Sequence, residues 1–130
     1  NNAVYQNYTE HARHEYLKTR GVDFAALTAT GVHVVVIRAE LDYLRSLRSG
    51  DVFCVTVQTE RVSRLRMAFT QHITLVNDGT PILNARFVVA AVDAQGRPCF
   101  PQALEALAPS WLSTNAPRAQ YDLMRSRAGR

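Results

Sequence analysis

The feature that most constrains the fold of this chain is an apolar stripe within its first residues. Apolar side chains recur there at Val4, Tyr8, Ala12 and Tyr16, and the stripe is widened by Tyr5 and Leu17. A repeat of four residues places them on one face of a helix, with polar residues such as Glu10 and Arg13 largely elsewhere. At about 1.5 Å per residue, a helix from Ala3 to Arg20 spans roughly 27 Å. Gly21 ends it, because glycine tolerates positive φ.

Alternating apolar and polar residues beyond Thr30 predict β-structure. Long strands are expected over residues 32–44, 51–62, 65–76 and 82–94. The run from Val32 to Ile37 is almost wholly β-branched, which predicts burial on both faces. Asn77 to Pro81 is predicted to be a tight turn, since Asp-Gly supplies positive φ angles. We therefore expect an α+β domain in which one early helix packs against a locally connected antiparallel meander.

Shorter elements flank these strands. Residues 22–27 are predicted to form a helical turn capped by Asp23, and Pro101 to Ala108 a short terminal helix. The domain is expected to occupy residues 1–108. Residues 109–130 form a basic tail, in which Tyr121, Leu123 and Met124 could lie on a short amphipathic helix.

Composition narrows the function. With 130 residues the chain holds one domain, and no apolar run is long enough to span a membrane. Basic residues exceed acidic ones by 15 − 11 = +4, and all but Lys18 are arginines, which favours an anionic partner. The arginines are scattered, unlike a nucleic-acid-binding surface. Cys54 and Cys99 form no C-x-x-C pair.

Three short motifs, taken in order, resemble 4-hydroxybenzoyl-CoA thioesterase-like proteins. The first is Asn1-Asn2-Ala3-Val4-Tyr5 followed by Tyr8, Glu10 and Ala12-Arg13, similar to that family's helix entrance. The second is Leu44-Arg45-Ser46-Leu47-Arg48-Ser49-Gly50-Asp51, similar to its P-L-R-x-G-D, and the third is Pro81-Ile82-Leu83-Asn84-Ala85, similar to its P-I-L-E-A. The chain looks closest to plant and cyanobacterial acyl-lipid, or fatty acyl-ACP, thioesterases. The resemblance covers Asn1 to Leu107. It implies a hotdog fold, in which a curled antiparallel sheet wraps a long central helix.

This resemblance also implies an activity: hydrolysis of fatty acyl thioesters carried by acyl carrier protein or CoA, without a cofactor. In that family a catalytic Asp precedes the Asn-Asn pair, so we expect a further strand and loop, carrying this carboxylate, ahead of Asn1. The reaction needs a polarised carbonyl and a base or carboxylate nucleophile. The resemblance places the oxyanion donor in the backbone at Asn2 and Ala3, at the positive end of the helix dipole. The alternative is that Asn1 or Asn2 only caps the helix.

Other candidates each have a simpler interpretation. Glu10 is the carboxylate nearest this helix entrance, and it could act as a base or only pair with Arg13 one turn on. His11 and His14 lie three residues apart without a third ligand, so no metal is expected. Turns like Ser63-Arg64, with Arg66 close by, often meet the pantetheine arm or phosphates of CoA in hotdog thioesterases. A charged turn can equally be a solvated surface.

Competing functions and the expected assembly complete these predictions. A non-catalytic acyl-thioester binding or regulatory module would keep the pocket and lack the base. A hotdog dehydratase is disfavoured because no histidine stands at a strand-to-helix entrance, and an α/β-hydrolase because there is no G-x-S-x-G. A homodimer or homotetramer is expected, since hotdog sites usually lie between subunits and Val32 to Ile37 would expose an apolar edge. The expected location is the cytoplasm, or the plastid stroma in a photosynthetic eukaryote.

Overall fold

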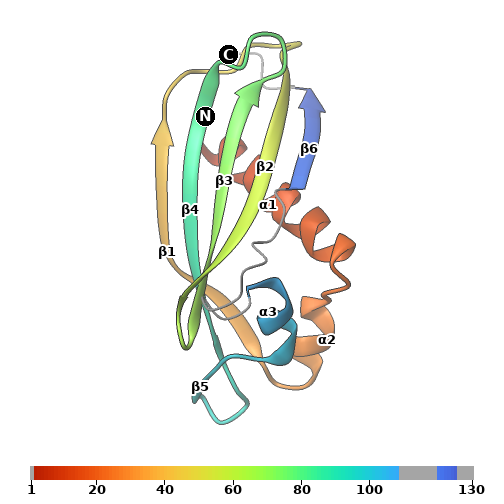
Figure 1. The fold of residues 1–130 in the computed structure, drawn as a ribbon, viewed down its shortest axis with the longest axis vertical. Coiled ribbons are helices and arrows are strands. Elements are labelled where there is room, and N and C mark those ends of the chain that lie inside the picture. Colours follow the sequence, from red (N-terminus) through yellow and green to blue (C-terminus); the bar gives the residue numbers. More distant parts are fainter. Residues whose placement is uncertain (1, 109–119, 126–130) are drawn as a thin grey trace.

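The computed structural model describes residues 2–108 and 120–125. Their centre is one antiparallel sheet with the strand order β1-β4-β3-β2-β6 (Figure 1). Its strands are β1 His33–Tyr43, β2 Val52–Ser63, β3 Arg66–Leu75, β4 Pro81–Val92, β6 Gln120–Arg125 and a two-residue β5, Pro98–Cys99, which pairs with β4. The four long strands lie within two residues of the predicted ranges. The α+β class with a curled antiparallel sheet is thus confirmed.

Helix α1, Asn2–Thr19, packs against one face of the sheet and runs along it. Near its start the Tyr5 hydroxyl accepts a hydrogen bond from the Leu47 N–H at 2.9 Å, and beyond its end Arg20 donates to the Ala106 carbonyl at 3.2 Å. The predicted helix is confirmed, as is its termination at Gly21, whose φ is +70°. Its buried residues are Tyr5, Thr9, Ala12, Tyr16 and Leu17.

Two short helices lie close to their predicted positions. In α2, Phe24–Ala29, the Asp23 carboxylate accepts from the N–H groups of Ala25 at 2.9 Å and Ala26 at 3.2 Å, so the predicted cap is confirmed. Helix α3, Gln102–Leu107, lies beside the β2–β3 turn. We refer to this turn and its surroundings as the lower end of the sheet. The upper end comprises the β1–β2 and β3–β4 connections, residues 44–51 and 76–80 (Figure 1).

The core lies between α1 and the sheet. Alternate residues of the three inner strands face the helix and are almost fully buried: Phe53, Val55 and Val57, then Met67, Phe69 and Ile73, then Leu83, Ala85, Phe87 and Val89. Burying each large apolar side chain contributes about 1.5–3 kcal/mol. The opposite face carries polar pairs such as His72 with Asn84, whose Nδ1 and Oδ1 are 2.7 Å apart. This alternation is why β2 to β4 could be read from the sequence.

The connectivity corrects the predicted meander. Strands β2, β3 and β4 are consecutive neighbours, whereas β1 pairs with β4 at the far edge, with Val35 opposite Ala90. The β1–β2 connection therefore crosses the upper end of the sheet, anchored by Leu47, which is 1% exposed. Hydrophobic alternation fixes which face a strand buries and not which strand lies beside it.

Two further predictions are wrong. Val35, Val36 and Ile37 are 45%, 50% and 45% exposed instead of buried on both faces, because β1 is an edge strand with no neighbour in the described chain. The segment through Tyr121 to Met124 is a strand and not a helix. It pairs with β2 from Val52 to Val57, where the backbone groups of the β2 edge require partners. In the predicted Asp-Gly turn only Gly79 has positive φ, +74°.

Candidate active site

The first turn of α1 is held against the upper end of the sheet. The Tyr5 ring, 9% exposed, packs at 5.8 Å from the Tyr43 ring and at 6.5 Å from the Tyr8 ring. With the Leu47 hydrogen bond, these contacts fix the start of the helix relative to the β1–β2 connection. Asn2 and Ala3 begin the helix there, and Ala3 is exposed. The predicted oxyanion donors thus lie at an accessible helix N-terminus, where the dipole favours negative charge.

A cavity of about 190 Å³ opens further along, between α1 and β1. Its walls are mainly apolar, and three polar side chains of α1 reach it. The lining residues are Glu10, Arg13, His14, Leu17, Phe24, Val34, Val35, Val36, Phe69 and Val89. His14, Leu17 and Phe24 also line an open groove of about 580 Å³ between the end of α1 and α2. Apolar walls with a few polar groups suit the acyl part of a ligand.

Arg13 is the most constrained charge in this cavity. Its Nη1 donates to the Gln71 Oε1 at 2.9 Å, and its guanidinium lies 4.1 Å from the centre of the Phe87 ring. Burial lowers the pKa of Arg13, and the nearby Glu10 carboxylate acts in the opposite direction. Gln71, fully buried, donates in turn to the Thr9 carbonyl at 2.9 Å. This network ties α1 to β3 and holds the guanidinium at the cavity wall.

The two predicted catalytic regions of α1 are well separated. Glu10 is eight positions beyond Asn2, which corresponds to about 12 Å along a helix. Within one chain, the backbone at Asn2 and Ala3 and the Glu10 carboxylate therefore cannot contact one thioester carbonyl. The structure places Glu10, which is exposed, beside the cavity and away from the helix entrance.

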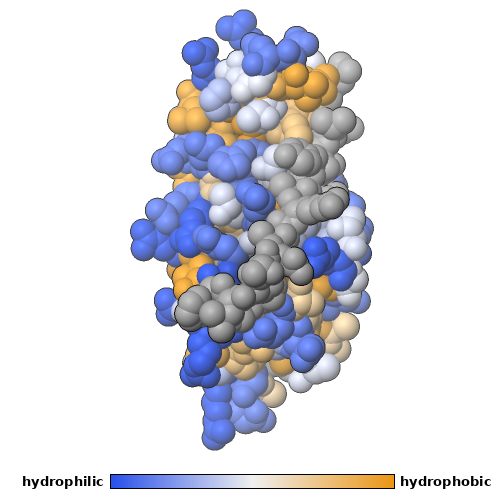
Figure 2. All heavy atoms as spheres, viewed as in Figure 1, coloured by the Kyte–Doolittle hydropathy of each residue, from blue (hydrophilic) through white to orange (hydrophobic). Residues whose placement is uncertain are grey.

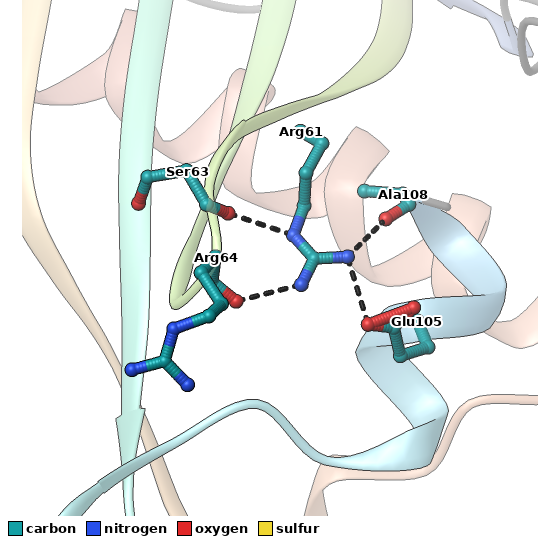
Figure 3. A network of polar contacts seen from close by, with 5 residues as sticks. All are labelled: Arg61, Ser63, Arg64, Glu105 and Ala108. Atoms are coloured by element: carbon teal, nitrogen blue, oxygen red, sulfur yellow. Dashed lines mark hydrogen bonds and ion pairs between the residues drawn. The ribbon is translucent and has the colours of Figure 1, made fainter. Parts of the chain in front are cut away.

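The predicted carrier-binding residues Ser63, Arg64 and Arg66 lie at the lower end of the sheet. Figure 3 shows that this turn is organised by Arg61, which donates to the Ser63 carbonyl at 2.8 Å and the Arg64 carbonyl at 2.6 Å. The Arg64 side chain is exposed and points away from this network. Residues 63–66 and the start of α1 thus occupy opposite ends of the sheet, so one chain does not bring the two predicted sites together.

Arg61, near the end of β2, has a structural role. Its side chain is 8% exposed and pairs with Glu105 at 2.8 Å, while its guanidinium stacks 3.7 Å from the Phe100 ring centre. It also donates to the Ala108 carbonyl at 3.2 Å (Figure 3). Arg61 therefore joins the β2–β3 turn to α3.

Among residues 2–108 and 120–125, no group of three or more His, Cys, Asp or Glu side chains is placed to hold a metal ion. No helix in that part of the chain has the length and hydropathy needed to cross a membrane. On the face shown in Figure 2, apolar patches are separated by hydrophilic side chains.

Comparison with known proteins agrees with this architecture. The profile of the Thioesterase-like superfamily matches residues 1–117. The chain belongs to this superfamily. It is 34% identical over 98 residues to a chloroplastic acyl-acyl carrier protein thioesterase of Arabidopsis thaliana, and the alignment covers 75% of this chain and 52% of that protein. A putative esterase of Synechocystis is 30% identical over 95 residues, covering 72% and 57% of the two chains. The chain thus spans little more than half the length of these relatives.

Solved structures show the same fold. A 1,4-dihydroxy-2-naphthoyl-CoA thioesterase from Synechocystis superposes with a TM-score of 0.75 at 13% identity, covering 81% of this chain and 80% of that one. The expected family is therefore confirmed. The fold of this chain is the hotdog fold of that solved thioesterase.

Gln71 and Arg13 are site residues that the sequence reasoning did not identify. Gln71 stands among Met67, Phe69 and Ile73 at inward positions of β3, where an amide requires a buried partner. A polar residue at an inward position of an otherwise apolar strand was the sequence signal that could have identified Gln71. Its partner, 58 positions away, could not be read from local sequence.

Proposed function

We propose that this protein hydrolyses fatty acyl thioesters of acyl carrier protein or CoA, giving a free acid and a thiol. The observation that carries the proposal is the apolar cavity along α1, in a chain of the thioesterase-like superfamily. The acyl-ACP thioesterase named among the relatives supports a fatty acyl substrate. In this proposal the acyl chain runs along α1 from the helix N-terminus toward the cavity.

Thioester hydrolysis requires a hydrogen-bond donor for the oxyanion and a base that activates water. Water attacks the thioester carbonyl carbon, a tetrahedral oxyanion forms, and the C–S bond breaks as the sulfur leaves and takes up a proton. We propose that backbone N–H groups at Asn2 and Ala3 stabilise the oxyanion, assisted by the helix dipole. The base is either a carboxylate ahead of Asn1, as the family pattern implies, or Glu10. Because Glu10 lies about 12 Å from Asn2, it serves only if the carbonyl lies in the cavity.

The assembly and location are also proposals. Exposed Val35, Val36 and Ile37 on the β1 edge favour at least a dimer through this strand, and in such a dimer α1 would be the central, enclosed helix of the hotdog fold. A tetramer of two such dimers is the further possibility to test. The chloroplastic relative supports the plastid stroma, and the cytoplasm is the alternative in a bacterium.

Turnover of defined thioesters tests the activity. Release of free thiol is followed for acyl-CoA, acyl-ACP and acyl-N-acetylcysteamine substrates of several chain lengths. Hydrolysis of any of these above the rate of the uncatalysed reaction supports the proposal. Saturable binding of acyl thioesters without turnover would instead establish the alternative, a non-catalytic binding or regulatory module.

A further inference from the structure

Three side chains border both of the hollow spaces beside α1. His14, Leu17 and Phe24 line the cavity of about 190 Å³ and also the open groove of about 580 Å³. Leu17 is buried in the core, whereas Phe24 is half-buried and His14 is exposed. The cavity and the groove therefore meet at these side chains, which we call the boundary. Phe24 is the member of the boundary that α2 contributes.

The connection between the two helices holds Phe24 in place. Beyond the end of α1, the Val22 N–H donates to the Leu17 carbonyl at 2.9 Å, which folds the chain back against the helix. The Asp23 carboxylate then accepts from two N–H groups in the first turn of α2. Phe24 follows this cap directly, and its side chain packs against the edge of the core. The backbone before and after Phe24 thus fixes where the ring lies.

Phe24 lies at the end of the cavity that is farther from the helix entrance. Of the α1 residues that line the cavity, His14 and Leu17 also line the groove, whereas Glu10 and Arg13 do not. The boundary is therefore at the Leu17 end. With the thioester carbonyl at the start of α1 or beside Glu10, the methyl end of the acyl chain points toward Phe24. This holds also where a second subunit supplies the oxyanion donor beside Glu10, because one chain builds the boundary.

The groove beyond the boundary suits an apolar occupant. Its two charged side chains already have partners, since Lys18 Nζ lies 3.6 Å from the Glu15 carboxylate and Asp23 caps α2. The other lining residues are mostly apolar: His14, Leu17, Gly21, Val22, Phe24 and Ala25. An acyl chain that passed the boundary would bury methylene groups against this surface, which is favourable.

We propose that Phe24 sets the length of the acyl chain that the protein accepts, because its ring closes the far end of the cavity against the groove. This inference rests on the proposed thioesterase function and adds a specificity-determining residue to it. The part of the substrate that Phe24 recognises is the methyl end of an unbranched acyl chain. Removing the ring joins the cavity to the groove and gives a longer chain further apolar contacts.

The dependence of activity on chain length tests this role. The values of kcat/KM are measured for a series of even-numbered saturated acyl-CoA substrates, from medium to long chains. In Phe24→Ala, a chain two methylenes longer than the preferred one should gain roughly tenfold in kcat/KM relative to the preferred one, because each newly buried methylene contributes roughly fourfold. Phe24→Leu keeps an apolar side chain at this position, and it should shift the preference in the same direction by a smaller amount.

Leu27 offers a matched control on the same helix. It is half-buried in α2 and lines neither the cavity nor the groove. Leu27→Ala loosens the packing of α2 without changing the boundary, so it should keep the original order of chain lengths. An equal shift in Leu27→Ala overturns the inference, as does an unchanged order of chain lengths in both Phe24 variants. A loss of activity that is uniform over all chain lengths in those variants also overturns it, since a purely structural role predicts that result.

A binding experiment separates this inference from the proposed function. If the unmodified protein hydrolyses no thioester, the proposed function fails. Calorimetric titration with free fatty acids of the same chain lengths then tests the boundary alone. A preference of Phe24→Ala for longer acids than the unmodified protein prefers supports the inference. The same preference in both proteins, or no binding by either, overturns it.

Discussion

Gln71 shows at the scale of one residue why a polar group can occupy an apolar core. Its amide oxygen accepts from Arg13 and its amide nitrogen donates to Thr9, so a fully buried group is satisfied on both sides. Gln71→Leu keeps a similar volume and removes both bonds. It leaves the Thr9 carbonyl and the partly buried Arg13 without these partners. We expect the free energy of unfolding, measured with urea, to fall by about 2–3 kcal/mol.

A matched control exists on the neighbouring strand. Gln58 on β2 is exposed, and Gln58→Leu should change the free energy of unfolding by no more than about 0.5 kcal/mol. Equal effects of the two substitutions would show that the Gln71 network contributes nothing beyond strand propensity.

Ala3 tests where the thioester carbonyl binds. Proline at this position removes one backbone N–H and is tolerated in the first helical turn, so Ala3→Pro should fold. If that N–H stabilises the oxyanion, kcat should fall on the order of a hundredfold with KM little changed. Ala3→Ser keeps the N–H and should retain activity. Should Ala3→Pro retain full kcat while Glu10→Gln loses it, the carbonyl would instead lie in the cavity beside Glu10.

Among the structural elements, the β2–β3 turn and α3 are joined by the side chain of Arg61. Its fork bonds three backbone carbonyls and Glu105 and stacks on Phe100. Lysine retains the charge but not the planar fork. Arg61→Lys should therefore lower the free energy of unfolding by about 2 kcal/mol. Glu105→Gln, at a half-exposed carboxylate, should cost under 1 kcal/mol, and the reverse ranking would assign the stabilisation to the ion pair alone.

The β3–β4 turn predicts a measurable pH effect. Hydrogen bonds from the Thr80 hydroxyl and N–H, followed by weaker contributions that include Arg45, lower the pKa of the exposed Asp78 carboxyl. A lowered folded-state pKa stabilises the turn above the ordinary aspartate pKa, and this stabilisation is lost as pH falls through the lowered value. NMR titration should find the Asp78 pKa below that of a free aspartate. Thr80→Val should move it back upward, and no movement would assign the shift to other groups.

The elements also show what could be predicted from sequence. Strands β2 to β4 bury one face, so their alternation located them within two residues, and Asp23 and Gly21 marked helix boundaries by local chemistry. Strand order, the β6 strand and the Arg13–Gln71 contact depend on residues distant in sequence. Local hydrophobic periodicity does not predict such long-range pairings. For the same reason the proposed site residues could be named from motifs, while their separation on opposite ends of the sheet could not.

On the scale of the whole molecule, the two ends of the sheet have different roles in these proposals. The upper end holds the start of α1 against the β1–β2 connection, while the lower end joins α2, α3 and the Arg61 network. Between them the cavity beside β1 is open at an edge where apolar side chains are exposed. A second subunit on that edge would cover the cavity wall formed by Val35 and Val36.

This arrangement makes the oligomeric state the broadest prediction. We expect at least a dimer through β1, because an exposed apolar edge strand offers both unpaired backbone groups and side chains for burial. Sedimentation at micromolar concentration should give at least twice the mass of one chain, and Val36→Asp should give the monomer. Val76→Asp, at a similarly exposed valine outside β1, should leave the assembly intact. If the unmodified protein is a monomer, there is no such interface, and if both substitutions dissociate the assembly alike, the interface is not specific to β1. In either case the cavity beside β1 would have to bind the acyl chain while open to solvent.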